Sequence, residues 1–133
     1  MQIPPKHTHI VSLAEASNYT ANFRKSDRNT GVCGGMFWKE AITKLISQPD
    51  CAGVRYYYAE QDNGTPALVM VGVDHEGKDM ITGVLLEESW ICPPYCSEVN
   101  LLNSGVSQGK WRPDRKPEIV NSPVENHEQA SRV

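Results

Sequence analysis

The fold is decided by the stretch Gly53-Val-Arg-Tyr-Tyr-Tyr-Ala59, which is followed by Asp62-Asn-Gly64 and then by Ala67-Leu-Val-Met-Val-Gly-Val73. In the first segment the side-chain pattern has a period of two residues, and aromatic residues are frequent. Both features favour a β-strand. The second is a turn signal, because Asn and Gly adopt the backbone conformations that a tight hairpin needs. The third is almost entirely apolar, which is typical of a central strand. We therefore predict a hairpin, followed by a third strand over residues 79–86.

Two helices are predicted before this hairpin. Ser12 and Glu15 have the spacing of a capping box, in which the two side chains satisfy free backbone N–H groups at a helix start. This predicts a helix over residues 13–25. A broad apolar stripe predicts a second helix over residues 36–48, which Pro49 ends. The order of elements predicts an α+β fold, with two N-terminal helices packed on one face of a small antiparallel three-strand meander.

The chain of 133 residues divides into three parts by composition. Residues 1–11 are predicted to form an extended lead-in, and residues 12–103 a single α+β domain. Residues 104–133 contain few large apolar side chains and show neither helical nor strand periodicity. Such a segment cannot bury enough apolar surface to offset its chain entropy, so it is predicted to be a disordered, flexible tail.

Charge and hydropathy exclude several classes of protein. The net charge is −3, and residues 1–103 carry 8 Lys and Arg against 12 Asp and Glu. This mildly acidic domain argues against nucleic acid, which requires a clustered basic face. The longest apolar run is far too short to span a bilayer, so no membrane is expected. Because no signal peptide is visible, we expect a cytoplasmic protein.

The segment Cys92-Pro-Pro-Tyr-Cys96 is the first candidate for chemistry. Its two cysteines are open to three functional roles: a disulfide, two ligands of a zinc ion, or a reactive thiol. A zinc site would need further ligands that no paired motif supplies, so neither a metal nor another cofactor is predicted. The simplest interpretation is structural. The two prolines stiffen a chain reversal, and the cysteines pack as small hydrophobic residues.

Three stretches of the chain carry a resemblance to a known group of proteins. They are Cys51-Ala-Gly-Val-Arg-Tyr-Tyr-Tyr58, Ala67-Leu-Val-Met-Val-Gly-Val-Asp74 and Ile91-Cys-Pro-Pro-Tyr-Cys-Ser97. The chain resembles a group of small uncharacterised bacterial proteins that end in a Cys-Pro-Pro-x-Cys segment. The resemblance covers about residues 14–102. It implies two helices, a short hairpin and the Cys-Pro-Pro-x-Cys ending, and it implies no activity.

Other single residues are weaker candidates for a site. Cys33 precedes the predicted second helix, where the helix dipole would lower the pKa of a thiol. Arg55 and Tyr57 alternate onto the same face of the first strand, where they could clamp a carboxylate or phosphate. A salt bridge from Arg55 to a nearby Asp is the simpler alternative. His75 lies in a predicted turn. A small-molecule binder or hydrolase that uses Arg55, Tyr57 and His75 is one alternative function.

No group of residues completes a catalytic constellation, so we predict an interaction or binding module without its own catalysis. Its most plausible partner is another protein, with Trp111 and Arg112 in the tail as docking residues, because aromatic and Arg side chains dominate interface energies. An exposed third strand could also pair edge to edge and form a homodimer. The alternative is a thiol-dependent redox sensor or enzyme that uses Cys92 and Cys96.

Overall fold

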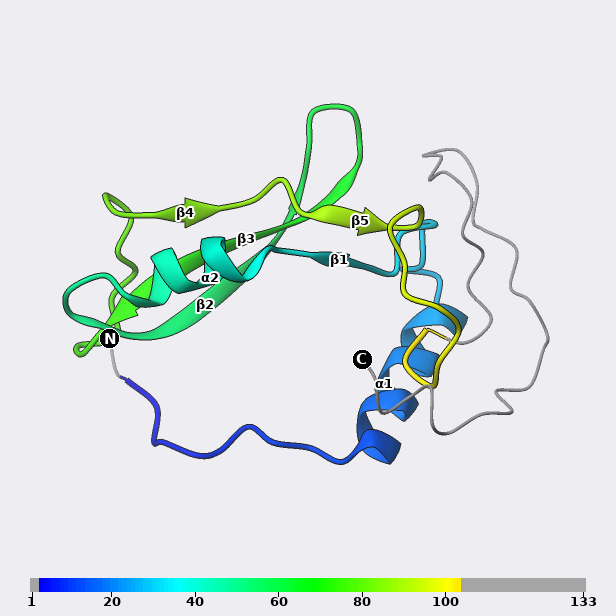
Figure 1. Cartoon of the computed structure of the whole chain (residues 1–133), viewed down its shortest axis with the longest axis horizontal. Helices are drawn as coiled ribbons and strands as arrows, with labels where there is room; N and C mark the ends of the chain where they lie inside the picture. Colours follow the sequence, from blue (N-terminus) through cyan, green and yellow to red (C-terminus); the bar gives the residue numbers. More distant parts are fainter. Residues whose placement is uncertain (1–2, 104–133) are drawn as a thin grey trace. The chain divides into compact units, whose positions relative to one another are not determined.

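A computed structural model describes residues 3–103 of the chain. The elements, labelled in Figure 1, are α1 (Leu13–Lys25), β1 (Gly34–Met36), α2 (Lys39–Ile46), β2 (Cys51–Glu60), β3 (Pro66–Asp74), β4 (Leu85–Leu86) and β5 (Trp90–Cys92). Helices and antiparallel sheets occur together, which confirms the mixed α and β class. The predicted tail, with Trp111 and Arg112, lies outside the described residues.

Residues 3–103 group into two compact units. The first comprises residues 3–8 and Phe37–Ser89, and the second comprises His9–Met36 and residues 90–103. Each unit has its own antiparallel sheet, with the order β2-β3-β4 in the first and β1-β5 in the second. The single domain expected over residues 12–103 stays a prediction. Among residues 3–103, no helix is long and apolar enough to cross a membrane.

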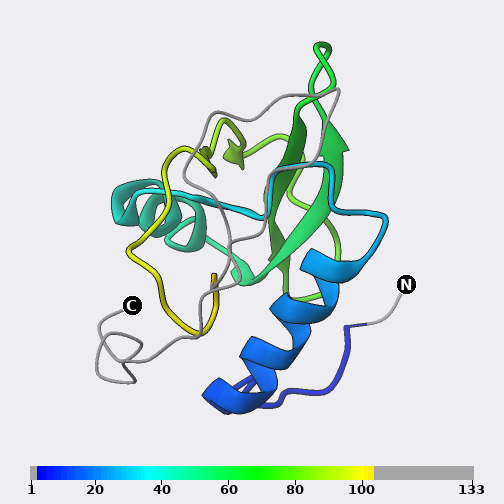
Figure 2. The ribbon, with the colours of Figure 1, turned by 90° about the vertical axis from the view of Figure 1, so that its right-hand side faces the viewer.

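The first unit is built on the predicted hairpin. Strands β2 and β3 pair antiparallel from Cys51 opposite Asp74 to Glu60 opposite Pro66, and they are the long green strands of Figure 2. Gly64 has a φ of 88°, which a residue without a side chain adopts most readily, and this explains the turn signal.

The third strand is shorter than the sequence predicts. Only Leu85–Leu86 form β4, which pairs with Met70 and Val71 of β3. Asp79, the predicted start of this strand, contributes an isolated bridge to Val73. A turn closed by the hydrogen bond from Gly83 N to Met80 O interrupts the segment between them.

Helix α2 packs on the sheet of the first unit. It contacts β2, β3 and β4, and its Leu45 side chain is fully buried. The prediction that this helix starts at Met36 is wrong, because Met36 belongs to β1 and Trp38, with an extended backbone, is the N-cap. The first helix, α1, belongs to the other unit, so the packing of both helices on one face of the sheet stays a prediction.

The second unit contains α1 and a short two-stranded ribbon. Helix α1 has the predicted bounds, and its capping box is formed by Ser12 and Glu15. The ribbon was not predicted. It pairs β1 with β5 antiparallel, placing Gly34 opposite Cys92 and Met36 opposite Trp90.

Candidate functional site

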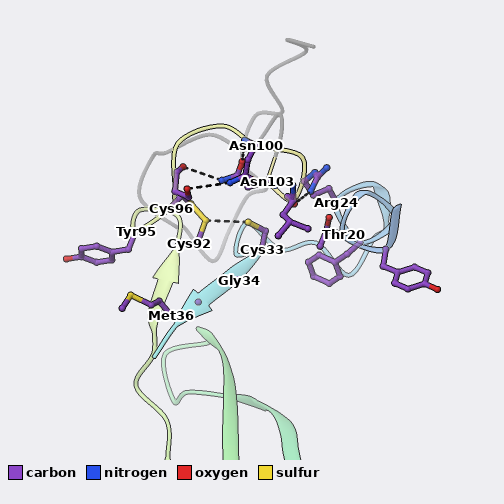
Figure 3. A pocket seen from close by; sticks show the side chains of 15 residues that line it. Thr20, Arg24, Cys33, Gly34, Met36, Cys92, Tyr95, Cys96, Asn100 and Asn103 are labelled. Atoms are coloured by element: carbon purple, nitrogen blue, oxygen red, sulfur yellow. Dashed lines mark hydrogen bonds between the residues drawn. A yellow bond between two sulfur atoms is a disulfide. The ribbon is translucent and has the colours of Figure 1, made fainter. Parts of the chain in front are cut away.

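Three of the four cysteines meet in the second unit. Cys92 and Cys96 are joined by a disulfide, with their Cα atoms 4.8 Å apart. The Sγ atom of Cys33, a free cysteine, lies 3.6 Å from the Sγ atom of Cys92. Figure 3 shows this contact as a dashed line beside the yellow disulfide bond. The fourth cysteine, Cys51, is free and belongs to the first unit.

The β1–β5 ribbon brings these sulfur atoms together. Cys33 N donates a hydrogen bond of 2.9 Å to Cys92 O, which fixes the two backbones side by side although the residues are 59 positions apart. The disulfide is formed within a tight chain reversal, closed by a hydrogen bond of 3.0 Å from Tyr95 N to Ile91 O. Two backbone hydrogen bonds, one between the strands and one within the chain reversal, therefore hold the three cysteines in place.

The sequence-based interpretation of Cys92 and Cys96 needs a correction. We expected both cysteines to pack as small hydrophobic residues, and instead they form a disulfide. The chain reversal around Pro93 and Pro94 was predicted, and it is what brings the two Cα atoms within the 4.4–6.8 Å that a disulfide requires. Pro93 is fully buried, whereas Pro94 is exposed.

The environment of Cys33 also differs from the prediction. Cys33 precedes strand β1, so the helix start that was expected to act on its thiol is not present there. Its pKa is raised, mainly because burial disfavours the charged thiolate. The positive charge of Arg24 on α1 and a backbone hydrogen bond act in the opposite direction and offset part of this effect. The prediction of a lowered pKa at Cys33 is therefore wrong.

A cavity of about 900 Å³ opens beside the sulfur atoms. All three cysteines of the cluster line it, together with apolar and aromatic side chains that include Tyr19 and Phe23 of α1. Arg24 supplies a positive charge to the same wall. A cavity of this size, largely apolar with few polar groups, has the features of a small-molecule site.

A hydrogen-bonded loop around Asn100, which is 1% exposed, forms part of the cavity wall. The Asn100 Oδ1 atom accepts hydrogen bonds from Leu102 N at 2.8 Å and from Asn103 N at 3.1 Å. Its Nδ2 group donates to Glu98 O at 3.2 Å. In addition, Arg24 Nη1 donates to Leu102 O at 2.6 Å, which ties this loop to α1. Figure 3 shows Asn100, Asn103 and Arg24 at this wall.

Arg24 and Asn100 are site residues that the sequence did not indicate. Arg24 is an ordinary basic residue in the last turn of α1, a position that Lys and Arg commonly occupy. Asn100 lies in a polar loop in which an amide side chain usually signals only a turn. Their roles depend on contacts with distant parts of the chain, so no local pattern could have revealed them.

Arg55 and Tyr57 are engaged elsewhere, in the first unit. Arg55 forms an ion pair with Asp79, and the hydroxyl of Tyr57 donates a hydrogen bond to the other carboxylate oxygen of Asp79. Arg55 thus forms the salt bridge to a nearby Asp that the sequence offered as the alternative to ligand binding. His75 lies in the turn between Asp74 and Gly77. Ligand binding by Arg55, Tyr57 and His75 stays a prediction.

Comparison of the chain with protein-family models, with curated proteins and with solved structures found no match. The resemblance to small bacterial proteins therefore stays a prediction. Within residues 3–103, no three His, Cys, Asp or Glu side chains are grouped so that they could hold a metal ion. The function is inferred below from the residues of this chain alone.

Proposed function

We propose that the protein is a thiol–disulfide redox protein in which the Cys92–Cys96 disulfide is the reactive group. The observation that carries this proposal is that both sulfur-bearing residues line the cavity of the second unit. A disulfide with a purely structural role has no need of an adjoining cavity. A redox-active disulfide must admit the sulfur of a reacting thiol, and the cavity provides that access.

The small size of the disulfide loop supports this role. Cys92 and Cys96 are separated by four positions, so the bond closes a loop of about five residues. In the chain-entropy description, closing such a loop stabilises the folded state by about 2 kcal/mol, against nearly 5 kcal/mol for a loop of about 100 residues. A bond between distant elements would stabilise the fold more. The short loop therefore favours a redox role for this disulfide over a role in stabilising the fold.

The reaction is thiol–disulfide exchange. The thiolate of a substrate attacks one sulfur of the disulfide, a mixed disulfide forms, and the other cysteine leaves as a thiolate. A second substrate thiol then attacks the mixed disulfide and releases the oxidised substrate. In total, two substrate thiols are oxidised to one disulfide while Cys92 and Cys96 are reduced to two thiols.

The lining of the cavity indicates the class of thiol. Tyr19 and Phe23 provide apolar surface, and Arg24 provides a positive charge. Arg binds carboxylates well through its planar fork of N–H donors. We infer that the substrate is a low-molecular-weight thiol with a carboxylate. We retain the cytoplasm as the proposed location, because cytosolic disulfides are usually transient and catalytic or redox-sensing.

The experiment is exposure of the oxidised full-length chain to reduced glutathione at about pH 7.5. Samples are quenched in acid, alkylated and analysed by mass. We expect Cys92 and Cys96 to become alkylated together, through a transient glutathione adduct. The variant Cys51→Ser is the matched control, because it removes the free thiol of the first unit and should leave the reaction unchanged. If the disulfide stays closed in excess glutathione, the redox proposal is wrong.

A binding role through β2 is the second candidate. In the described sheet β2 is an edge strand, and Tyr56 and Tyr58 on one face are 55% and 85% exposed. Long exposed edges readily pair with another strand. The edge that the sequence favoured for a homodimer was the third strand, but β4 has only two residues, so we propose β2 as the pairing edge.

Sedimentation velocity over a range of protein concentrations tests this candidate. We expect a second copy of the chain to pair with β2, and the charged variant Tyr58→Lys to shift the equilibrium toward the monomer. The variant Ile81→Lys is a control at another exposed apolar residue of the same unit, 71% exposed. A wild-type protein that stays monomeric at all concentrations would rule out this pairing.

A further inference from the structure

We propose that Cys33 is a third redox cysteine, which opens the Cys92–Cys96 disulfide from within the protein and transfers the bond to Cys33–Cys92. This inference rests on the proposed redox function and adds an internal step to it. The protein would then have two oxidised forms. One holds the Cys92–Cys96 bond with Cys33 free, and the other holds the Cys33–Cys92 bond with Cys96 free.

The geometry favours attack on Cys92. The Cys33 Sγ atom lies 3.6 Å from the Cys92 Sγ atom, close to the 3–3.5 Å separation of reacting atoms in near-attack geometries. Because Cys92 is oxidised, the hydrogen of this contact belongs to Cys33, whose S–H group donates to the Cys92 sulfur. A disulfide requires a sulfur separation of about 2.05 Å, so the Cys33 and Cys92 sulfur atoms have only a short distance left to close.

The backbone keeps the two residues in place during the exchange. Cys33 and Cys92 are linked by the hydrogen bond from Cys33 N to Cys92 O, and the adjacent ribbon pairs Gly34 with Cys92. Cys96, by contrast, lies beyond the two prolines and outside the ribbon. Release of Cys96 therefore leaves the β1–β5 pairing intact. The step requires the Cys33 and Cys92 side chains to approach each other and the Cys96 segment to move away.

The exchange balances without an external oxidant or reductant. Cys33 loses its proton to solvent, and the thiolate attacks the Cys92 sulfur. The bond between Cys92 and Cys96 breaks, its electron pair leaves with the Cys96 sulfur, and Cys96 takes up a proton. One disulfide and one thiol are present before and after the step, so no net oxidation occurs.

The step also gives Cys33 a role in substrate turnover. When a substrate thiol has formed a mixed disulfide with Cys92, the Cys33 thiolate can attack the same Cys92 sulfur and expel the substrate thiol. Burial raises the pKa of Cys33, and the charge of Arg24, on the wall of the cavity, offsets part of this effect in favour of the thiolate. It acts through its charge on Cys33, so it is a positioning residue in this exchange.

Peptide mapping without reduction detects the transferred bond. Trypsin cleaves after Arg and Lys, which places Cys33 in the peptide 29–39, and both Cys92 and Cys96 in the peptide 79–110. The original disulfide lies within one peptide, whereas a Cys33–Cys92 bond joins two peptides. Fragmentation of the joined pair then shows whether Cys96 carries the alkyl group.

The first arm incubates the oxidised full-length chain at about pH 7.5 without added thiol, and samples are quenched in acid and then alkylated. We expect the joined peptides to appear, with Cys96 alkylated and an equal loss of alkylation at Cys33. The second arm compares Cys96→Ser with Cys92→Ser under oxidised glutathione. Because the Cys33 sulfur contacts the Cys92 sulfur, the Cys33–Cys92 bond of Cys96→Ser should form about tenfold faster or more than the Cys33–Cys96 bond of Cys92→Ser.

The outcomes separate this inference from the redox function. If glutathione opens the Cys92–Cys96 bond but neither arm yields a Cys33–Cys92 bond, the internal transfer is overturned and the redox function stands. If glutathione leaves the bond closed, the redox function fails, and the second arm still reports whether Cys33 and Cys92 can join. Equal rates for the two variants would also overturn the inference, because the sulfur contact would then have no effect.

Discussion

The substitution Asn100→Ala is expected to destabilise the second unit, in which the reactive cysteines lie. Asn100 is almost fully buried, and its side chain accepts hydrogen bonds from two backbone N–H groups and donates to Glu98 O and to Ser97 Oγ. Alanine removes all four interactions. It also leaves the N–H groups of Leu102 and Asn103 without this partner.

The magnitude follows from these hydrogen bonds. Each contributes about 1 kcal/mol net, and the bond to Ser97 Oγ at 3.4 Å contributes least. The expected loss in the free energy of unfolding is therefore about 2–4 kcal/mol. The comparison variant Asn103→Ala removes two solvent-exposed hydrogen bonds, to Ser97 O and Glu98 O, and the bond of 2.8 Å that Asn103 Oδ1 accepts from Asn100 N. Its cost should be smaller, about 1–2 kcal/mol.

Urea unfolding followed by tryptophan fluorescence measures this loss. The chain has three tryptophans, and only Trp90 belongs to the described part of the second unit. A background with Trp38→Phe and Trp111→Phe therefore leaves one reporter beside the disulfide loop. If Asn100→Ala unfolds within about 0.5 kcal/mol of its background, the loop does not depend on this side chain and the reasoning is refuted.

Three further predictions concern stability and reactivity. Leu45→Ala should destabilise the first unit by about 2–5 kcal/mol in urea unfolding, because it leaves a cavity under α2. The pKa of Asp79 is lowered, mainly by the hydrogen bond from Tyr57. The ionised Asp79 therefore stabilises the folded state fully above the ordinary pKa near 4, and this stabilisation is lost as the pH falls through the lowered pKa. Asp79→Asn should remove this part of the acid dependence of the unfolding midpoint, and an unchanged dependence would contradict it. Arg24→Gln should slow alkylation of Cys33 at about pH 7.5, whereas Arg24→Lys should keep most of the rate.

The elements that the sequence predicted well are those fixed by local signals. The bounds of α1 follow from the capping box of Ser12 and Glu15, which acts within one helical turn. The hairpin follows from strand patterning on both sides of a turn at Gly64. Both signals lie within about 25 residues of the chain.

The β1–β5 ribbon could not be predicted, because its formation depends on residues far apart in sequence. Strand β1 begins with Gly34 and Gly35, which have low strand propensity, and its partner strand begins only at Trp90. The spacing of Cys92 and Cys96 was sufficient to select them as candidates. Cys33 was also selected, but from a helix start that does not exist, and its contact with Cys92 exists only because of the ribbon.

The reduction potential of the Cys92–Cys96 bond tests the central claim most directly. The full-length protein is equilibrated in buffers of reduced and oxidised glutathione, quenched in acid, and the fraction of alkylated Cys92 and Cys96 is measured by mass. We predict a reversible two-electron transition with a midpoint above roughly −300 mV, in the range of exchange-active disulfides. A bond that stays oxidised in all glutathione buffers, with a midpoint below roughly −300 mV, would identify a structural disulfide and contradict the account.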